Sequence, residues 1–303
     1  MRDVMISLLF LTVFVVELYL GALITLSFQG LVSTRWILSL EEILKKILLL
    51  RFLIPILLIV LFIGRSSIYP WVVSENLSIG FPRVYFNSTF FILRNLFYLL
   101  VWFLLTHWVR KNKYGGLVLV FILFTGTLWS FDWVLSLTPH FKSTTFGLVF
   151  LTSGTMAALG LSVLFTKIKP TPQGLQDINN VHFTLIGSWL YLSFVQFQII
   201  WSGNLPDEAH WYLLRSSPSW KALSIFIVIF QCVVPLFSLL LIRLKSSFKI
   251  TRFFAGLTFV MQILVAFWLV LPAVYPQGMS FTLFSVLALL ATLSPFVWMR
   301  RFA

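Results

Sequence analysis

The chain has 303 residues, of which 59% are hydrophobic and only 10% are charged, and its mean hydropathy is +0.98. This composition excludes a soluble globular protein and is typical of a polytopic membrane protein. The net charge of +13 comes from short clusters of Lys and Arg between apolar runs, a pattern that argues against a nucleic-acid-binding face. The single cysteine, Cys232, excludes an internal disulfide, a cysteine-rich zinc site, an iron–sulfur cluster and covalently attached haem. We therefore expect any redox centre to be a quinone, a histidine-bound haem or a group on a partner chain.

Apolar segments of roughly 20 residues, each long enough for one membrane crossing, occur nine times. We predict an all-α, polytopic membrane protein that forms a single integral membrane domain over residues 1–303, with no separate soluble domain. The nine spans are expected near 5–28, 47–64, 90–109, 116–137, 144–166, 181–201, 221–242, 253–271 and 279–299. Pro55, Pro235 and Pro295 fall inside spans, where a proline is expected to kink the helix.

The distribution of Lys and Arg predicts the orientation of the spans. With nine spans the termini lie on opposite sides; seven of the 22 Lys and Arg fall on the N-terminal side and the other 15 on the C-terminal side. The seven are Arg2, Arg65, Arg83, Arg94, Lys142, Arg215 and Lys221. Because cytoplasmic loops carry the excess of positive charge, we expect a cytoplasmic C-terminus and an N-terminus outside. Residues 132–140 and 202–220 then face the outside, and residues 176–182 face the cytoplasm.

Glu17 lies near the middle of the first predicted span, far from either membrane surface. A carboxylate there is costly to desolvate, so it needs a polar partner or a bound proton. Two roles remain open for it: a member of a proton relay, and a protonated side chain with a structural hydrogen bond. Arg2 before the apolar run also permits a signal peptide, although Glu17 interrupts the run and no small-residue cleavage site follows.

Residues 131–147 (FDWVLSLTPHFKSTTFG) place one acid in an apolar run that breaks at Pro139 and His140. Asp132 lies about one and a half turns from the outer end of its span, where water can reach it. It is either part of a proton path or a solvated helix-end residue. Its neighbour Trp133 is a candidate for stacking against a quinone ring, although the twelve Trp residues lie largely at span ends, as in an aromatic interface belt.

Asp177, Asn179, Asn180 and His182 are expected at the cytoplasmic start of the sixth span. An acid at this position also complements a helix N-terminus, which is a structural explanation for Asp177. A haem b would require two histidines at matched depth on facing helices. Only His107 and His182 fall near the cytoplasmic ends of spans, and neither has a second histidine that repeats the pattern, so a haem is the less favoured interpretation.

The stretch 131–147, followed by LVFLTSGTMAALG, resembles the central motif of the second quinone-binding-type membrane subunit of alternative complex III. That complex is a quinol:electron-acceptor oxidoreductase, and the subunit belongs to the polysulfide-reductase/NrfD-like group. Residues 176–183 (QDINNVHF) are similar to the HDLGKLLF-like segment of the family. Residues 196–213 (QFQIIWSGNLPDEAHWYL) are similar to its SQ-x-x-IWY-x-N-x-PEE-x-x-YYL run. The resemblance is collinear over residues 15–245.

The resemblance implies two four-helix bundles with peripheral spans, packed against a sister multispan subunit, against periplasmic iron–sulfur and multihaem cytochrome subunits, and against lipids. The residues carried over are Asp132, His140, Asp177, Gln196, Asn204 and Glu208. On this basis Asp132 and His140 serve the outer half of a proton path, and Asp177 with His182 forms its inner mouth. Gln196, Asn204, Glu208 and Trp133 are candidates for quinone or partner contacts. Menaquinone or ubiquinone is the implied cofactor, haem and iron–sulfur centres are implied only on partner subunits, and the implied location is the bacterial inner membrane.

The sequence departs from the family at three places. Gln176 stands where the family has His, and Asn180 stands where it has Lys, which puts proton entry through this motif in doubt. Residues 28–34 (FQGLVST) lack the paired His that often follows the corresponding helix. The family has ten spans, and the missing span corresponds to the first one.

Two functions of different classes are compatible with the sequence. In the first, the chain is an integral subunit of a quinol-oxidising respiratory or photosynthetic electron-transfer complex, with no catalytic residue or metal site of its own, and contributes scaffold, a quinone contact and a proton path. In the second, it is a stand-alone ion-coupled transporter or channel-like protein. Transporters commonly show internal repeats with broken helices, whereas this sequence shows only two groups of about four spans.

Overall fold

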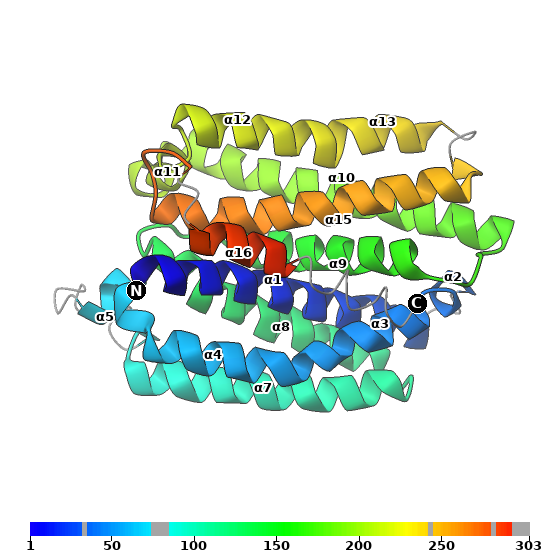
Figure 1. Ribbon diagram of the computed structural model, residues 1–303, viewed down its shortest axis with the longest axis horizontal. Helices are drawn as coiled ribbons and strands as arrows, with labels where there is room; N and C mark the ends of the chain where they lie inside the picture. Colours follow the sequence, from blue (N-terminus) through cyan, green and yellow to red (C-terminus); the bar gives the residue numbers. More distant parts are fainter. Residues whose placement is uncertain (32–34, 74–84, 242–244, 280–282, 293–303) are drawn as a thin grey trace.

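The computed structural model of the chain describes residues 1–31, 35–73, 85–241, 245–279 and 283–292, and all regular structure in these ranges is helical (Figure 1). This confirms the predicted all-α class. The longer helices are α1 (Arg2–Ser27), α4 (Leu53–Ile63), α7 (Ser88–Arg110), α8 (Gly115–Trp133), α9 (Phe146–Phe165), α10 (Pro172–Gly203), α12 (Pro218–Ile227), α15 (Phe248–Val270) and α16 (Leu283–Thr292). The shorter α-helices are α2 (Arg35–Leu38), α3 (Glu41–Ile47), α5 (Pro70–Val73), α11 (Pro206–Leu213) and α13 (Val234–Leu240). Short 3₁₀ segments are η1 (Phe28–Gly30), η2 (Leu48–Phe52), η3 (Arg65–Ser67), η4 (Leu135–Leu137) and η6 (Leu271–Ala273), and η5 (Val228–Val233) is π-helical.

Eight helical segments within the described residues are long and apolar enough to cross a membrane. They are Arg2–Ser27, Glu41–Ile63, Ser88–Arg110, Gly115–Leu137, Phe146–Phe165, Pro172–Gly203, Pro218–Leu240 and Phe248–Ala273. These segments correspond in order to the first eight predicted spans. Of the ninth, predicted at 279–299, the described part is residue 279 and α16, and residues 293–299 lie outside the described residues.

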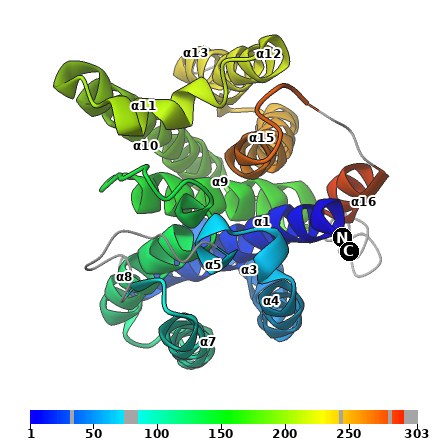
Figure 2. The ribbon, with the colours of Figure 1, turned by 90° about the vertical axis from the view of Figure 1, so that its left-hand side faces the viewer.

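The long helices run side by side and pack as two groups of four (Figures 1 and 2). The first group contains α1, the α3–α4 segment, α7 and α8, and the second contains α9, α10, the α12–α13 segment and α15. The two groups meet mainly where α1 packs along α9, with α8 also against α9 and α1 against α15. We call the end of the molecule with the N-terminus and α11 the α11 end, and the opposite end the α2 end (Figure 1).

Two glycines allow α1 and α9 to approach closely at the centre of the molecule. A Cβ atom at Gly21 would lie 1.9 Å from the carbonyl oxygen of Gly154, and a Cβ at Gly154 would lie 2.1 Å from the carbonyl oxygen of Glu17. Small residues at such crossings let helix backbones touch inside a membrane, where van der Waals packing replaces the hydrophobic effect as the driving force for association. The α1–α9 crossing therefore joins the two bundles.

Two of the predicted kinks appear as changes of helix type next to proline. Proline lacks an N–H group, and its ring clashes with the carbonyl four residues earlier. The chain is 3₁₀-helical over η2, directly before the turn that holds Pro55, and π-helical over η5, two residues before Pro235. In both segments the change of helix type accommodates the carbonyl four residues before proline, which cannot accept the hydrogen bond that a regular α-helix would form there. Pro295 lies outside the described residues.

The helix of the sixth span is longer than the sequence predicts, because it begins at Pro172 and not near residue 181. Thr171 caps it by accepting a hydrogen bond from the Gly174 N–H at 3.1 Å, and Pro172 occupies the first turn, where its missing N–H costs nothing. The first turns are polar, so an apolar window does not detect them. Asp177 consequently lies in the second turn, beyond the first-turn positions where the helix dipole favours an acid most.

Candidate functional site

A cavity of about 250 Å³ lies near the α11 end of the second bundle, where it is lined by residues of α9, α10, α11, α12 and α15. Its lining is mainly aromatic and includes Trp189, Phe194, Phe197, Trp211, Tyr212 and Trp268. Phe194 and Phe197 are also 57% and 41% exposed on the surface of α10. The cavity is therefore enclosed by the bundle on one side and bounded on the other by side chains that would face lipid.

The short helix α11 carries Trp211 and Tyr212 to the cavity. Asn204 ends α10 in the left-handed conformation with φ of 45°, which asparagine adopts more readily than most residues, and Pro206 starts α11 two residues later. Trp211 stacks on Phe141 at a centroid distance of 4.8 Å and meets Trp268 edge-on at 5.2 Å. These ring contacts fix the position of α11.

Ser193, Gln196 and Tyr212 are among the polar residues that line the cavity, and Ser143 contacts Gln196 from outside the lining. Ser143 Oγ donates to Gln196 Oε1 at 2.9 Å, and Gln196 Nε2 donates to the Tyr212 hydroxyl at 3.3 Å. Ser193, one turn before Gln196 on α10, has a buried hydroxyl oxygen with no hydrogen-bond partner among the described residues. Burial also raises the pKa of the Tyr212 phenol, so this group is a neutral hydrogen-bond donor at physiological pH. A largely apolar cavity with a few polar groups at one place is typical of a small-molecule site.

Arg215 lies directly behind the aromatic wall of this cavity. Its side chain is buried, with 4% of the residue exposed, and its guanidinium carbon lies 3.5 Å from the Trp211 ring centroid and 4.8 Å from that of Trp268. Nη1 donates to the Trp211 carbonyl at 2.7 Å and Nη2 to the Leu269 carbonyl at 2.9 Å. No carboxylate in the described part of the chain pairs with it.

Asp132, the acid on which the sequence motif centres, is ion-paired in the first bundle. Arg94 on α7 donates from Nη2 to Asp132 Oδ1 at 2.8 Å and from Nε to Oδ2 at 3.1 Å, and Tyr98 donates its hydroxyl to Oδ2 at 3.0 Å. The third guanidinium nitrogen donates to the Tyr85 carbonyl at 2.8 Å. Asp132 has no exposed surface, so the expectation of a carboxylate reached by water from outside is wrong. The reason is that Arg94, which the charge count assigned only to the outer side, lies in α7 and pairs with this carboxylate.

Trp133 is part of an aromatic core around this ion pair. Its indole nitrogen donates to Asn95 Oδ1 at 2.7 Å, its carbonyl accepts from the Tyr69 hydroxyl at 2.9 Å, and the residue is 1% exposed. Its ring packs against those of Tyr69, Phe91 and Trp129. His140, the other outer member of the predicted proton path, is exposed in the loop between η4 and α9. The structure thus does not bring His140 and Asp132 into contact.

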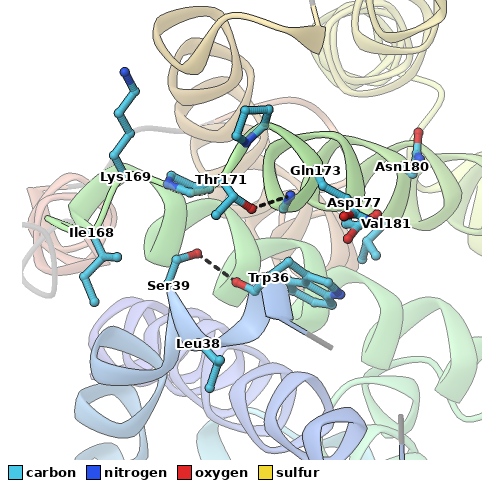
Figure 3. Close-up of a pocket in the computed structure, with 13 residues that line it drawn as sticks. Trp36, Leu38, Ser39, Ile168, Lys169, Thr171, Gln173, Asp177, Asn180 and Val181 are labelled. Carbon is cyan, nitrogen blue, oxygen red and sulfur yellow. Dashed lines mark hydrogen bonds between the residues drawn. The ribbon is translucent and has the colours of Figure 1, made fainter. Parts of the chain in front are cut away.

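The α2 end holds a larger and more polar cavity of about 1,320 Å³ between α2 and the start of α10 (Figure 3). Asp177, Gln173 and Asn180 line it from α10, and Trp36 and Ser39 line it from the opposite side. Asp177 is partly exposed here. His182 lies one turn deeper, buried, with Nε2 at 2.7 Å from the Thr258 hydroxyl on α15.

The two histidines considered for a haem are far apart in the packing. His107 is exposed on α7 of the first bundle, and His182 is buried on α10 of the second. They do not face each other, so the structure does not provide the paired ligands that a haem b requires.

Glu17 is fully buried on α1, and neither of its carboxyl oxygens has a hydrogen-bond partner among the described residues. A second buried polar group lies on the other side of α9, where Gln231 Nε2 and Gln262 Nε2 approach the Met156 sulfur at 3.7 and 3.9 Å. Met156 is two residues from Gly154, whose Cα faces the Glu17 backbone, so both groups lie at a similar depth.

The remaining candidates occupy peripheral positions at the α11 end. Asn204 is exposed and its backbone conformation ends α10, which accounts for the residue structurally. Glu208 is partly exposed on α11. Of all the candidates, only Gln196 lines the aromatic cavity.

Sequence reasoning missed Arg94, Tyr98, Tyr212 and Arg215. Arg94 and Tyr98 are four residues apart on one face of α7, near the same predicted membrane surface as Asp132, and this matched depth is the signal that could have paired them. Arg215 carried no local signal, because it was one basic residue in a loop on the side poorer in positive charge.

No protein-family profile matches the chain, and no curated protein matches it. Within the described residues, eight helical segments are long and apolar enough to cross a membrane, which makes the chain a multi-pass integral membrane protein.

Proposed function

We propose that the chain is a quinone-binding membrane subunit of a quinol-oxidising electron-transfer complex similar to alternative complex III. The observation that carries this proposal is the aromatic cavity at the α11 end, with Gln196 and Tyr212 at its polar part. Gln196 belongs to one of the segments on which the resemblance rests, and it is the only residue singled out from the sequence that lines this cavity.

The dimensions and chemistry of the cavity suit a quinone ring. Its volume of about 250 Å³ is slightly below the range of about 300–1,000 Å³ found for drug-sized ligands, so it fits a ring but not a long isoprenoid tail. Phe194 and Val228 line the cavity and are also exposed, so the cavity borders the surface on which the tail would meet the bilayer. Trp189 and Trp268 offer ring faces, and both already have their indole N–H groups paired, with Ser153 and Ser224.

In this proposal, other subunits carry the redox centres that accept the electrons. The bound cofactor is menaquinone or ubiquinone, and the electrons pass to iron–sulfur or haem groups on periplasmic partner subunits, next to a sister multispan subunit. In the bacterial inner membrane, with the N-terminus outside, the α11 end faces the periplasm. Protons from quinol are then released on that side. Asp177 and His182 at the α2 end, and Glu17 in the interior, remain the candidates for a path from the cytoplasm.

An ion-coupled transporter is the second candidate, and one observation favours it. The interior of the membrane domain contains acceptor oxygens without partners among the described residues, on Glu17, Gln231 and Gln262, and Gln231 lies in the π-helical segment η5. Transporters place ion sites where a helix is broken near the midplane. Gentle solubilisation from the native membrane separates the two functions: a sister multispan subunit with a haem or iron–sulfur protein copurifies with the chain in the first, and a homo-oligomer alone is obtained in the second.

The quinone site is tested by blocking the cavity. Menadione is titrated into the full chain in lipid nanodiscs, and binding is followed by quenching of tryptophan fluorescence. Ser193→Phe fills the cavity and is expected to weaken binding about tenfold or more, which corresponds to about 1.4 kcal/mol or more. The matched control is Ile199→Phe on the same helix, which is 51% exposed and points away from the bundle. Equal affinities in both variants would refute the site.

A further inference from the structure

The buried charge of Arg215 is the feature of the cavity that quinone binding alone does not explain. A guanidinium removed from water is costly unless a carboxylate or several acceptors compensate it. Arg215 has two backbone carbonyls as acceptors, whereas its Nε has no partner among the described residues. The acids nearest in sequence, Asp207 and Glu208, lie toward the other end of α11 and are not paired with it.

This charge acts on the cavity across a single layer of rings. The guanidinium lies against the rings of Trp211 and Trp268, and both indoles also line the cavity. Aromatic rings and the surrounding bundle screen a charge far less than water does. A ligand in the cavity therefore experiences a positive potential that originates from Arg215.

Tyr212 supplies a directed hydrogen bond at the same place. Its hydroxyl oxygen accepts from Gln196 Nε2 at 3.3 Å, and Ser143 fixes that amide by donating to its other atom at 2.9 Å. Since the hydroxyl acts as acceptor toward Gln196, its own hydrogen is available for a ligand. Tyr212 is three residues before Arg215, so the free hydroxyl hydrogen and the buried cation come from one turn of the chain.

We propose that this end of the cavity selects ring ligands that carry an ionised oxygen, with Tyr212 donating to that oxygen and Arg215 stabilising its charge. The inference rests on the proposed function and specifies it, because a quinol that has lost one proton is such a ligand and its neutral quinone is not. Hydrogen bonds to charged groups are roughly twice as strong as neutral ones, which gives the site its selectivity.

A purely structural role for Arg215 predicts something different. Its two acceptor carbonyls, on Trp211 and Leu269, lie in the last turns of α11 and α15, where a cation complements the helix dipoles. If Arg215 only holds these two helix ends together, its replacement alters the shape of the cavity and weakens neutral and ionised rings to the same extent.

The experiment compares two naphthoquinones of similar size in full-length protein in nanodiscs at pH 7. Menadione is neutral, and 2-hydroxy-1,4-naphthoquinone is ionised. The readout is the ratio of their two Kd values in each variant, because partitioning into lipid is the same for all variants and cancels. We expect Arg215→Gln to shift this ratio about tenfold against the ionised ring, with menadione affinity changed less than about twofold, and Arg215→Lys to retain most of the preference.

Tyr212→Phe provides a second variant in case Arg215→Gln does not fold, since the Tyr212 hydroxyl makes one hydrogen bond, of 3.3 Å, within the described part of the chain. It should also shift the ratio against the ionised ring, by about fivefold. A ratio unchanged in both variants, or an equal loss for both ligands, overturns the selectivity. Absence of binding of either ring to the unmodified chain overturns the proposed function instead, so the two failures are distinguishable.

Discussion

Removing either member of the Arg94–Asp132 ion pair should destabilise the first bundle strongly. The pair joins α7 to α8 through two hydrogen bonds of 2.8 and 3.1 Å, and 8% of Arg94 and none of Asp132 is exposed. Breaking a buried pair from one side costs about 3–5 kcal/mol, because the remaining charge stays buried without compensation. We place Arg94→Gln at the upper end of this range, since it strands a carboxylate that has no contact with solvent. Asp132→Asn lies at the lower end, because Arg94 keeps its bond to the Tyr85 carbonyl.

The assay is thermal unfolding of the detergent-solubilised chain at a fixed scan rate, because membrane proteins often unfold irreversibly. At about 2–4 °C per kcal/mol for a chain of this size class, each single variant should lower Tm by about 10 °C. The double variant Arg94→Gln/Asp132→Asn restores neutrality and should recover part of the loss, with a coupling of at least about 1.5 kcal/mol. Arg110→Gln is the matched control, because Arg110 is exposed at the end of the same helix.

Two results would contradict this reasoning. If both single variants unfold within about 2 °C of the unmodified chain, the pair is not formed in the native protein. If the double variant loses the sum of the two single losses, the side chains act independently. In the predicted case Asp132 stabilises the contact between α7 and α8. A loss of the proposed activity in Asp132→Asn would then be explained by lower stability of the fold and not by removal of a proton carrier.

Three further predictions address the bundle interface, the interior acid and the topology. Gly154→Ala places a carbon 2.1 Å from the Glu17 carbonyl and should cost about 1–3 kcal/mol by overpacking, whereas Gly187→Ala meets nothing within 4 Å and should leave Tm unchanged or raise it. Glu17→Leu removes two buried oxygens that lack partners among the described residues, so Tm should hold or rise, and a fall of more than about 2 °C would reveal a partner for the carboxyl group. A periplasm-active reporter should be silent when fused after Arg301 and active when inserted between residues 202 and 220, and the reverse pattern would exclude the proposed orientation.

The fold was predictable because its determinants are local. A run of about 20 apolar residues is sufficient to indicate a membrane helix, and in the described part of the chain eight such helical segments lie where the runs are. The error at the start of α10 has the same origin, because residues 172–180 are helical but polar and extend the helix beyond its apolar part. The sequence predicted a distortion at Pro55 and Pro235 from single residues, but the 3₁₀ and π-helical types of η2 and η5 are findings of the structure.

The candidate site was only partly predictable, because its contacts join residues far apart in the chain. Arg94 and Asp132 are 38 residues apart, and Ser143 and Gln196 are 53 apart. Single-sequence patterns identify Asp132 as an acid that needs a partner, but they do not identify the partner. Gln196 was singled out by resemblance, whereas Tyr212 faces it only because Asn204 and Pro206 turn the chain back into α11.

Burial of Arg94 and Arg215 also changes the meaning of the charge count that orients the protein. The positive-inside rule concerns charges in loops, which translocation would have to carry across the membrane. Of the seven Lys and Arg assigned to the outer side, Arg94 lies within α7 and Arg215 is buried behind the aromatic cavity. On the side predicted to be cytoplasmic, Lys45, Lys46, Arg51 and Arg252 likewise fall within segments that qualify as membrane spans, so both sides of the count contain charges that are not in loops. The same two residues are the ones whose charge has to be explained by a contact, and each lies at a candidate site: Arg94 against Asp132, and Arg215 behind the cavity that we assign to the quinone ring.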